Sequence, residues 1–372
     1  MRIGIDARIL GYRRAGIGKY TQRLIEQLPT LEKQDNFFIL HSWRDSETLV
    51  KQANFHRQTL LTPCHNRFEQ WILPLETFFL GLDLLHSPDF IPPFYRTYKS
   101  IITVHDLAFL RFPHFVTSDS AHHYGMIDQA ARNTDHIIAV SESTKADLIN
   151  MLGVSERKIT VIHEAADPIY RLINDKASIQ QALEKYKLAQ RPYIFFLSTI
   201  EPRKNLPTLL RAFRQLLDEY PTMKDLLLAV AGEKGWLFED VFKLYNDLNL
   251  QQHVYFLGRV AQEDLPALFN GAIIHVHPSF YEGFGLTPLE AMACGTPTIS
   301  SNVSSLPEVV GDAGLLVPPD NIDEWTNSIY RLINDSTLRQ TLSEKGLRRA
   351  AQFSWNKAAQ QHLEVYHRFR TM

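Results

Sequence analysis

The chain has 372 residues, enough for about two domains, and 45% of them are hydrophobic, so it can bury substantial cores. Its formal net charge of −2 and its pI of about 6.7 give no overall positive field, so we expect no nucleic-acid partner. The two cysteines, Cys64 and Cys294, are far apart in sequence. They predict neither a disulfide framework nor a zinc site, which fits a reducing compartment.

The N-terminal residues 1–8 carry charges where a signal peptide needs an apolar run. No apolar stretch reaches the ~18–20 residues that a membrane span requires. We therefore expect a cytoplasmic chain that does not cross a membrane. Peripheral contact with the cytoplasmic face of a membrane stays open.

Short apolar runs alternate with helical periodicity along the chain, which is typical of a parallel sheet covered by helices. A first series of strands is predicted at Arg2–Ile5, Phe37–His41, Leu84–His86, Ile101–Val104, His136–Val140 and Thr160–Ile162. A second series is predicted at Tyr193–Ser198, Leu226–Ala231, Val254–Leu257, Ile273–His277, Thr298–Ser300 and Leu315–Val317.

A polar stretch, residues 168–191, separates the two series and is predicted to connect two domains, with one helical piece at Ser178–Lys187. The predicted fold is α/β, with two doubly wound Rossmann-like domains facing each other across a cleft. In such sheets ligands bind beyond the C-terminal ends of the strands, so chemistry is expected there.

A glycine-rich segment follows the first predicted strand, with Gly11, Gly16 and Gly18 ahead of a helix. The dinucleotide fingerprint would need a third glycine or alanine where Thr21 stands, so the signal is weak. Two interpretations remain equally good. The segment is either a tight turn into a helix, or a mobile loop whose backbone approaches a phosphate or a sugar.

The stretch from Trp71 to Leu80 is rich in large apolar residues. Its apolar residues are too continuous, and its flanks too poor in Lys and Arg, for an interfacial membrane helix. We therefore predict a packed helix that leads into the strand at Leu84–His86.

His105 directly follows the strand Ile101–Val104, so its imidazole should lie at the C-terminal edge of a sheet. A histidine considered alone is more often structural than catalytic, but this position favours function. Ser141, which follows His136–Val140, is predicted to cap the next helix.

Two adjacent cations, Arg203 and Lys204, follow the first strand of the second series, just before a helix. Such pairs are usually solvated surface residues. At a strand end, however, a guanidinium fork and an ammonium suit a phosphate, and we favour that interpretation.

The segment from Glu282 to Glu290 is the most informative in the chain. It places two carboxylates on either side of a glycine-rich turn, with Thr287 predicted as N-cap and Pro288 as first helical residue. A helix N-terminus suits a diphosphate. Glu290, inside the helix, would repel phosphate and suits the hydroxyl groups of a ribose, whereas Glu282 suits a second sugar. The segment therefore predicts a nucleotide-sugar site.

His275 and His277 could suggest a metal together with the two glutamates. We expect the two histidines to point to opposite faces of their strand, which would be poor geometry for one ion. Because Arg203, Lys204 and a helix N-terminus can neutralise a diphosphate, no metal and no cofactor are expected.

These motifs together resemble the retaining glycosyltransferases of family 4, which have the two-domain GT-B fold, over nearly the whole chain. The resemblance rests on segments in a fixed order: Gly16–Tyr20, His86–Pro88, Val104–Phe109, Val140–Glu142, Glu201–Asn205, Phe256–Val260, Glu282–Glu290, Ala291–Pro297, Leu306–Glu308 and Gly311–Gly314.

The resemblance implies an acceptor-side domain at residues 1–170, completed by a C-terminal helix at 355–372, and a nucleotide-sugar-binding domain at 190–354. It implies that Arg203 and Lys204 hold the donor diphosphate, that Glu290 binds the ribose, and that Glu282 binds the transferred sugar. His105 would hydrogen-bond that sugar at the reaction centre.

The other donor contacts that the resemblance implies come from two loops near the base and the sugar and from backbone N–H groups. They are Gly16, Gly18, Gly232, Arg259, Val260, Gly283, Phe284, Gly285, Leu286 and Thr287. The implied donor is UDP-glucose or GDP-mannose. The implied acceptor is a glycan or lipid-linked glycan in cell-surface polysaccharide synthesis.

Two other functions remain as alternatives. A nucleotide-sugar epimerase on the same fold would change the donor without an acceptor. A non-catalytic scaffold would bind the nucleotide-sugar without turnover, but the presence of Arg203, Lys204 and Glu282 ranks it last.

Overall fold

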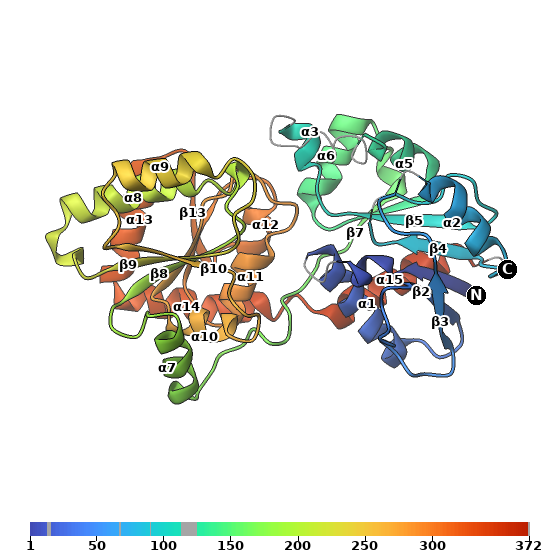
Figure 1. The fold of residues 1–372 in the computed structure, drawn as a ribbon, viewed down its shortest axis with the longest axis horizontal. Helices are drawn as coiled ribbons and strands as arrows, with labels where there is room; N and C mark the ends of the chain where they lie inside the picture. Colours follow the sequence, from blue (N-terminus) through green and yellow to red (C-terminus); the bar gives the residue numbers. More distant parts are fainter. Residues whose placement is uncertain (13–15, 67, 90, 113–124, 371–372) are drawn as a thin grey trace. The chain divides into compact units, whose positions relative to one another are not determined.

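The computed structural model describes residues 1–12, 16–66, 68–89, 91–112 and 125–370. The chain divides into two compact units, one made of Met1–Glu164 with Ser354–Met372, the other of Ala165–Phe353 (Figure 1). Each unit contains one parallel sheet with helices on it. Residues 13–15 of the predicted glycine-rich loop lie outside the described residues.

The sheet of the first unit has the strand order β3-β2-β1-β4-β5-β6-β7 and is parallel throughout. Its order therefore reverses between β1 and β4. In chain order the strands are β1 (Arg2–Asp6), β2 (Asn36–Ser42), β3 (Phe55–Leu60), β4 (Leu84–Ser87), β5 (Lys99–Val104), β6 (His136–Ala139) and β7 (Ile159–Val161).

The helices of the first unit include one from the far end of the chain. They are η1 (Arg8–Gly11), α1 (Ile17–Leu31), α2 (Glu69–Phe78), α3 (Ala108–Arg111), α5 (Ile127–Asn133), α6 (Glu142–Leu152), η3 (Glu156–Lys158) and α15 (Trp355–His367). Helix α15 packs on α1 and is tied to the sheet by a hydrogen bond between Tyr366 Oη and His86 Nδ1 at 2.6 Å. Ser141 caps α6 by accepting a bond from the Thr144 N–H, as predicted.

The sheet of the second unit has the order β10-β9-β8-β11-β12-β13, which reverses between β8 and β11. In chain order the strands are β8 (Tyr193–Leu197), β9 (Leu227–Ala231), β10 (Val254–Gly258), β11 (Ile274–His277), β12 (Thr298–Ser301) and β13 (Gly314–Val317).

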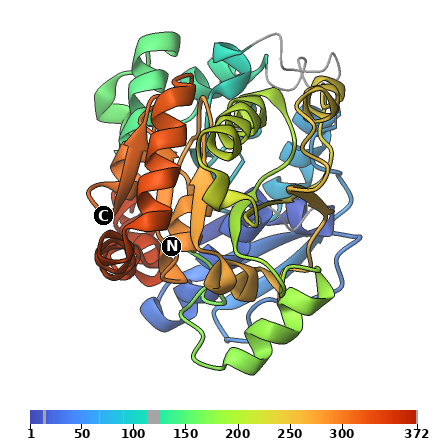
Figure 2. The same ribbon diagram turned by 90° about the vertical axis from the view of Figure 1, so that its left-hand side faces the viewer.

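Helices cover both faces of this second sheet. They are α7 (Lys176–Lys185), η4 (Pro202–Lys204), α8 (Leu206–Glu219), η5 (Pro221–Met223), α9 (Glu239–Asp247), α10 (Leu265–Gly271), α11 (Leu286–Ala293), α12 (Leu306–Val310), α13 (Ile322–Asn334) and α14 (Ser336–Ala350). Figure 2 shows α8 and α13, which pack on each other, from the side of this unit.

The strands of the second sheet are apolar on both faces because both faces are covered. Along β8, Ile194 and Phe196 pack into the core under α8 and α13, whereas Tyr193 and Phe195 pack into the core under α10 and α11. This alternation follows from the pleat of a strand. It explains why short apolar runs were a usable signal for these strands.

Every predicted strand is present, with ends that differ by two residues or fewer. The prediction missed β3, whose interior residues, His56 to Thr59, are all polar. It is an edge strand, paired only with β2 in the described sheet, so solvent rather than a core faces it. A polar strand of this kind has no apolar signature.

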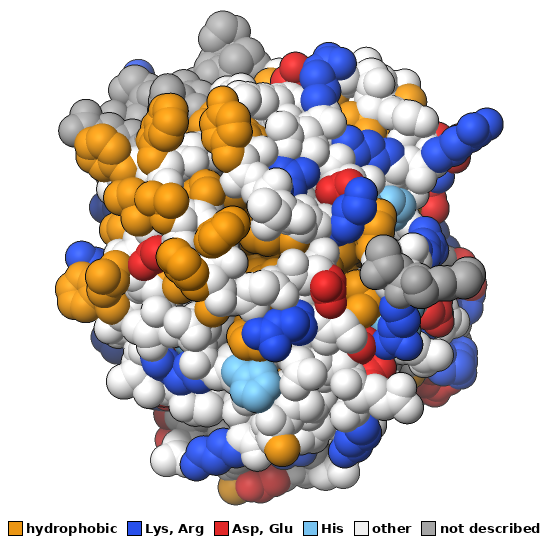
Figure 3. Space-filling view, turned by 90° about the vertical axis from the view of Figure 1, so that its right-hand side faces the viewer, with side chains coloured by type: hydrophobic (Ala, Val, Ile, Leu, Met, Phe, Trp, Pro, Cys, Tyr) orange, Lys and Arg blue, Asp and Glu red, His pale blue; other side chains and the backbone are white. Residues whose placement is uncertain are grey.

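The prediction of a helix between Trp71 and Leu80 is confirmed, but the prediction that it is packed is wrong, because most of its large side chains are exposed. Helix α2 buries Glu69, Leu73 and Thr77, but its other apolar residues face solvent. We name this set the α2 apolar surface, visible among the hydrophobic side chains that gather on one face in Figure 3; it consists of Phe68, Trp71, Ile72, Leu75, Phe78 and Phe79. Phe79, at its end, is 87% exposed.

Among the described residues, no helix combines the length and the apolar composition that crossing a membrane would take.

Candidate functional site

Three of the predicted donor-site residues, Arg203, Lys204 and Glu282, gather where the order of the second sheet reverses. The loop after β8 carries Arg203 and Lys204 in η4, and the loop after the neighbouring strand β11 carries Glu282. Both strands are parallel, so both loops leave the same edge of the sheet. Ligands of open α/β sheets bind at such a reversal, because the two loops diverge and leave a crevice.

Glu282 is the centre of this group and is only 8% exposed. Its Oε1 accepts bonds from Lys204 Nζ at 2.7 Å, Ser279 Oγ at 2.8 Å and His277 Nε2 at 2.8 Å. Its Oε2 lies 3.4 Å from Arg203 Nη1. A single carboxylate thus holds two cations at the strand ends.

The backbone and a second carboxylate fix this arrangement. The Glu282 N–H donates to Ser304 Oγ at 2.9 Å, and its carbonyl accepts from Ser305 Oγ at 2.9 Å. Arg203 also pairs with Glu201, whose Oε1 lies 3.0 Å from Nη2. Two cations therefore face two carboxylates, so the cluster is balanced in charge without a ligand.

Electrostatics make Glu282 a stable anion. Burial by itself raises the pKa of this carboxyl, but Lys204 and Arg203, together with the hydrogen bond from His277, hold it well below its ordinary value. Burial lowers the pKa of His277, and Lys204 and Arg203 oppose the raising effect of Glu282 on that imidazole. His277 is therefore neutral, and we assign the proton to Nε2, since the carboxylate can only accept.

Helix α11 begins two residues earlier than predicted. Its N-cap is Gly285 at φ 110°, no side chain caps it, and the first helical residue is Leu286, so Thr287 is not the N-cap and Pro288 is not the first helical residue. The left-handed φ that the chain adopts before the helix favours glycine and explains why no Ser or Thr stands there. The N–H groups of Leu286 and Thr287 have no acceptor within the helix by the geometry of a helix start.

Glu290 lies in α11 and is 8% exposed, so it is inside the protein rather than on its surface. Burial raises the pKa of the Tyr170 phenol, and the neighbouring Glu290 carboxylate raises it further, so Tyr170 stays a neutral hydrogen-bond donor. Phe284 is likewise buried, 5.8 Å between ring centroids from Phe353.

The expectation that His275 and His277 point to opposite faces is wrong. Residues two apart in a strand share a face, and the two rings stack at 5.8 Å between centroids. The prediction also missed His277, Ser279 and Glu201 as parts of the cluster. The period of two would have placed His277 on the same face as His275, at the end of the strand that leads to Glu282, and Glu201 is only two residues from Arg203.

The residues predicted near the base follow the next strands of the sheet. Gly232, after β9, donates its N–H to the Gly258 carbonyl at 2.8 Å. A Cβ at Gly232 would lie 1.8 Å from the Ser198 carbonyl oxygen, so only glycine fits. Arg259 is exposed and lies 3.6 Å from Glu233, whereas Val260 packs at the edge of a core.

His105 belongs to the first unit, at the end of β5. Its Nδ1 lies 2.9 Å from Glu164 Oε1 and its Nε2 lies 2.9 Å from the Pro88 carbonyl oxygen. Burial lowers the pKa of this imidazole, but the hydrogen bond and charge of Glu164 and the Pro88 carbonyl outweigh it and raise the pKa above 6.5. Both ring nitrogens thus donate to acceptors in the protonated form.

Gly16 and Gly18 lie at the start of α1 in the first unit. Gly16 is the N-cap, at φ 54°, and its carbonyl accepts the Tyr20 N–H at 3.0 Å. Tyr20 Oη then contacts Thr103 Oγ1 at 3.0 Å, and its ring meets His105 edge-on at 4.8 Å.

One group of metal-ligating side chains, Glu32, Asp35 and His367, occurs among the described residues. Asp35 already pairs there with the Met1 ammonium and with Arg370. None of the predicted donor-site residues belongs to this group.

Comparison with known proteins identifies the chain. Residues 15–169 match Glycosyltransferase Family 4, and residues 178–349 match Glycosyl transferases group 1. The O-antigen chain mannosyltransferase B of Escherichia coli is 30% identical over 98% of this chain and 99% of its own length. The chain belongs to glycosyltransferase family 4. It is a retaining hexosyltransferase that uses a nucleotide-sugar donor.

Solved structures show the same fold for this glycosyltransferase. Sucrose-phosphate synthase from Thermosynechococcus elongatus superimposes with a TM-score of 0.78 at 22% identity, over 99% of this chain and 98% of that one. Anabaena HepE, solved in complex with UDP-glucose, gives a TM-score of 0.76 at 19% identity, over 98% and 99%. These likenesses establish the GT-B fold with its two Rossmann-like units.

Proposed function

We propose that this glycosyltransferase moves a mannosyl group from GDP-mannose to a lipid-linked glycan during synthesis of a cell-surface polysaccharide. The observation that carries the donor site is the Glu282 carboxylate, buried with Lys204 and Arg203 at the reversal of the second sheet and followed by the start of α11. The Escherichia coli relative is an O-antigen chain mannosyltransferase, which favours mannose over glucose as the transferred sugar.

In this proposal Arg203 and Lys204 turn from Glu282 toward the donor diphosphate. Both side chains are only partly buried, with 17% and 13% of their surface exposed, so a phosphate can reach them. Glu282, still held by His277 and Ser279, then binds hydroxyls of the transferred sugar. The start of α11 adds backbone donors, and Glu290 binds the ribose.

The chemistry follows from this placement. The bond between the anomeric carbon and the diphosphate oxygen breaks, and the acceptor oxygen bonds to the same face of the sugar, which keeps the configuration. The acceptor proton passes to the departing diphosphate. Losing one preorganised donor to developing charge costs ~3–4 kcal/mol, so Arg203, Lys204 and the start of α11 supply a large part of the stabilisation.

His105 and the Gly16–Gly18 segment are the proposed contributors from the first unit. The imidazolium form of His105, favoured by Glu164, would donate a hydrogen bond to the transferred sugar once one present acceptor is exchanged. Gly232, Arg259 and Val260 are the proposed neighbours of the base.

The donor assignment is tested by nucleoside diphosphate release from UDP-, GDP- and ADP-sugars, with EDTA present. We expect slow hydrolysis of GDP-mannose alone. Loss of activity in EDTA that Mg²⁺ or Mn²⁺ restores would contradict metal-free charge neutralisation by Arg203 and Lys204. An epimerised donor without an acceptor would favour the epimerase, and absence of donor binding in a direct titration would favour the scaffold.

We also propose that the α2 apolar surface rests on the lipid bilayer that carries the acceptor. Trp, Tyr and Phe favour the membrane interface, and here Trp71 lies next to Tyr95, with ring centroids 6.4 Å apart. Both carboxylates of α2 have partners: the buried Glu69 pairs with Arg8, and the half-buried Glu76 accepts the Leu61 N–H at 2.7 Å. The exposed side of the helix therefore carries no unpaired acid that would oppose an anionic headgroup layer.

Flotation with vesicles of phosphatidylglycerol and phosphatidylethanolamine tests the membrane contact. We expect wild type to float and the double variant Phe78→Ser/Phe79→Ser to stay in solution, with Trp43→Ser, another exposed aromatic, as the matched control. Concentration-dependent dimerisation of wild type, abolished in the same variant without any vesicle binding, would assign the surface to a second copy instead.

A further inference from the structure

A chain of buried hydrogen bonds runs through the first unit, between its sheet and the C-terminal helix α15. Tyr366 Oη lies 2.6 Å from His86 Nδ1, and His86 Nε2 lies 2.8 Å from Thr103 Oγ1. Thr103 Oγ1 lies 3.0 Å from Tyr20 Oη, which in turn lies 2.6 Å from His362 Nε2. None of the five side chains is more than 2% exposed. The chain therefore joins β4, β5 and α1 to two positions on α15.

The direction of each bond follows from the last member of this chain. His362 Nδ1 lies 2.7 Å from the Ala358 carbonyl oxygen, which can only accept, so we assign the proton to Nδ1. Burial lowers the pKa of His362 to about 4, so the ring is neutral and its Nε2 accepts from the Tyr20 hydroxyl. Burial raises the pKa of the Tyr20 phenol, which keeps its proton for this bond. Tyr20 Oη is then an acceptor toward Thr103, whose hydroxyl donates to it.

The same reasoning extends to the other end of the chain. Thr103 has used its only proton, so its Oγ1 accepts from His86 Nε2. Burial lowers the pKa of His86 well below its ordinary value, so this ring is neutral and its Nδ1 accepts from the Tyr366 hydroxyl. All bonds thus point one way, from Tyr366 to the Ala358 carbonyl. Removing one hydroxyl from the interior of the chain leaves a buried donor and a buried acceptor unpaired, so the members support one another.

Three members of the chain lie next to the groups that fix His105. The Tyr20 ring meets the imidazole edge-on, with 4.8 Å between ring centroids. Thr103 lies on β5, two residues before the histidine. His86 lies on β4, two residues before Pro88, whose carbonyl oxygen is 2.9 Å from His105 Nε2. The place of His105 therefore depends on the elements that the chain ties together.

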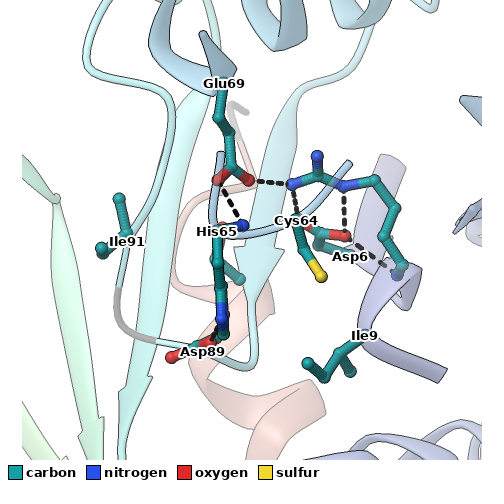
Figure 4. Close-up of a pocket in the computed structure, with 9 residues that line it drawn as sticks. Asp6, Ile9, Cys64, His65, Glu69, Asp89 and Ile91 are labelled. Atoms are coloured by element: carbon teal, nitrogen blue, oxygen red, sulfur yellow. Dashed lines mark hydrogen bonds and ion pairs between the residues drawn. The ribbon is translucent and has the colours of Figure 1, made fainter. Parts of the chain in front are cut away.

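The Pro88 carbonyl is held from both sides. On one side, His86 belongs to the chain. On the other side, Asp89 pairs with His65, whose N–H donates to Glu69 at 3.0 Å (Figure 4). The acceptor of the imidazole Nε2 is thus fixed by two anchors, whereas the edge of the ring is held by the aromatic contact with α1.

Tyr20 joins that aromatic contact to the last helix. Its ring also meets Trp355, the first residue of α15, with 5.8 Å between centroids. Its hydroxyl bonds to His362 two turns further along the same helix. Ring and hydroxyl together therefore fix the orientation of Tyr20 between α15 and His105, before any donor binds.

We infer that Tyr20 is a positioning residue for His105, and that the one-way chain from Tyr366 to His362 sets its place. The inference rests on the proposed role of His105 in glycosyl transfer and adds a dependence of the reaction centre on helix α15. Tyr20 meets the imidazole with its ring while its hydroxyl is engaged in the chain, so it acts through the placement of His105.

Histidine NMR of the full chain without donor is the first test. In wild type labelled with ¹⁵N-histidine, we expect the Nδ1–H tautomer for His362 and the Nε2–H tautomer for His86. Tyr20→Phe keeps the ring beside His105 but breaks the chain, so the signals of His105, identified by their absence in His105→Ala, should shift. Tyr366→Phe breaks only the first bond and should shift them less.

Tyr98→Phe is the matched control for these variants. Tyr98 is a buried phenol of the same unit, and its Oη lies 2.7 Å from Thr77 Oγ1. It has no place in the chain, so its loss should leave the His105 signals where they are. Unchanged His105 signals in both chain variants, or the opposite tautomer at His86 or His362, would overturn the inference.

Donor turnover separates positioning from stability and is the second test. We expect Tyr20→Phe to lower kcat for nucleoside diphosphate release by about tenfold, because a misplacement of about 1 Å can cost up to ~10²-fold. The donor KM should stay within about twofold, since the ground-state contacts of the donor are kept. Tyr98→Phe should lose a similar amount of thermal stability, because it also loses one buried hydroxyl bond, but keep its kcat.

Equal kcat values in Tyr20→Phe and Tyr98→Phe would reduce the chain to a structural role and overturn the inference. If Tyr20→Phe does not fold, Tyr366→Phe carries both tests, because it leaves the tyrosine beside His105 intact. If wild type turns over no donor, the proposed function fails, and the His105 signals, measured without donor, still decide whether Tyr20 positions the histidine.

Discussion

The two units each contain a buried histidine–glutamate pair at a strand end, and the two pairs behave in opposite ways. His105 Nδ1 lies 2.9 Å from Glu164 in the first unit, and His277 Nε2 lies 2.8 Å from Glu282 in the second. The distances are nearly equal and both histidines are buried or nearly so. Yet the pKa of His105 is raised and that of His277 is lowered.

The difference arises from the cations that surround each glutamate. Glu282 already carries Lys204 and Arg203, so adding a third positive charge at His277 is unfavourable, and burial decides. Among the described residues, no Lys or Arg side chain is paired with Glu164. The negative charge of Glu164 therefore raises the pKa of the His105 imidazole. The same residue pair thus favours the neutral imidazole in the second unit and the protonated imidazole in the first.

Removing the Lys204 ammonium, which contacts Glu282 of the second pair, should have the largest effect. We expect Lys204→Met to lower kcat by roughly 10²–10³-fold, because it removes a preorganised charge on the leaving diphosphate. It should also raise the pKa of His277, since one of the cations that oppose protonation is gone. Nucleoside diphosphate release and an NMR titration of His277 measure the two effects.

Lys345→Met is the matched control for that change, because Lys345 pairs with Asp312 at 2.7 Å on the surface. Surface pairs contribute about 0–1 kcal/mol, so its kcat should stay near wild type. Activity of Lys204→Met within about twofold of the control would remove Lys204 from the reaction.

Glu290 extends the comparison with Glu282, because it is also a buried carboxylate but lies next to a phenol, Tyr170. We expect Glu290→Ala to raise the donor Kd by about tenfold to a hundredfold with little change in kcat, because a ribose contact is similar in the ground state and the transition state. Isothermal titration with GDP-mannose checks this, with the exposed Glu344→Ala as control. An unchanged Kd would remove the ribose assignment.

The first pair predicts a pH effect with a definite sign. Because the folded pKa of His105 is raised above 6.5, the stability from its protonated form is complete below about pH 6.5 and is lost as the pH rises through the folded value. Glu164→Gln removes the charge, so this loss should move to lower pH. The pH profiles of kcat and of the unfolding free energy measure the shift, with the exposed Glu156→Gln as control.

His105→Ala separates function from stability in the same unit, because it should lower kcat more than it raises the donor KM. If kcat and its basic limb are unchanged in both His105→Ala and Glu164→Gln, His105 takes no part in the chemistry.

The sequence predicted the fold well because burial leaves a strong pattern. Strands such as β8, apolar on both faces, were recognisable, whereas the polar edge strand β3 was not. The prediction for α2 was wrong for the converse reason. A continuous apolar run indicates burial, but most of this one faces solvent. Apolar composition predicts that side chains avoid water, but not whether the core of the same chain or another partner covers them.

The candidate site was predictable where charge was informative. Arg203, Lys204 and Glu282 stood out because charged residues at strand ends are unusual, and the structure brings them together. His277 was missed because the faces of its strand were misassigned, and Ser279 was missed because it lies in the loop after that strand, where no periodicity marks a side chain. A pocket at the end of β1, lined by Asp6, His65 and Asp89 among others, was missed because its residues come from three separated segments.

The smallest expected effect is also the cleanest test of the second pair. Ser279 Oγ donates to the Glu282 carboxylate at 2.8 Å, and the same oxygen also accepts from Lys204 and His277. Because two donors remain, losing this bond should cost about 0.5–1.5 kcal/mol, less than the ~1.5–3 kcal/mol typical of a hydrogen bond to a charged group. Ser279→Ala should therefore weaken donor binding by only about threefold to tenfold and leave Lys204 in place. Ser300→Ala is the matched control, because Ser300 is fully buried but its Oγ has no partner among the described residues. Removing that hydroxyl should be neutral or slightly stabilising, so equal losses in the two variants would mean that packing, and not the bond to Glu282, explains the effect.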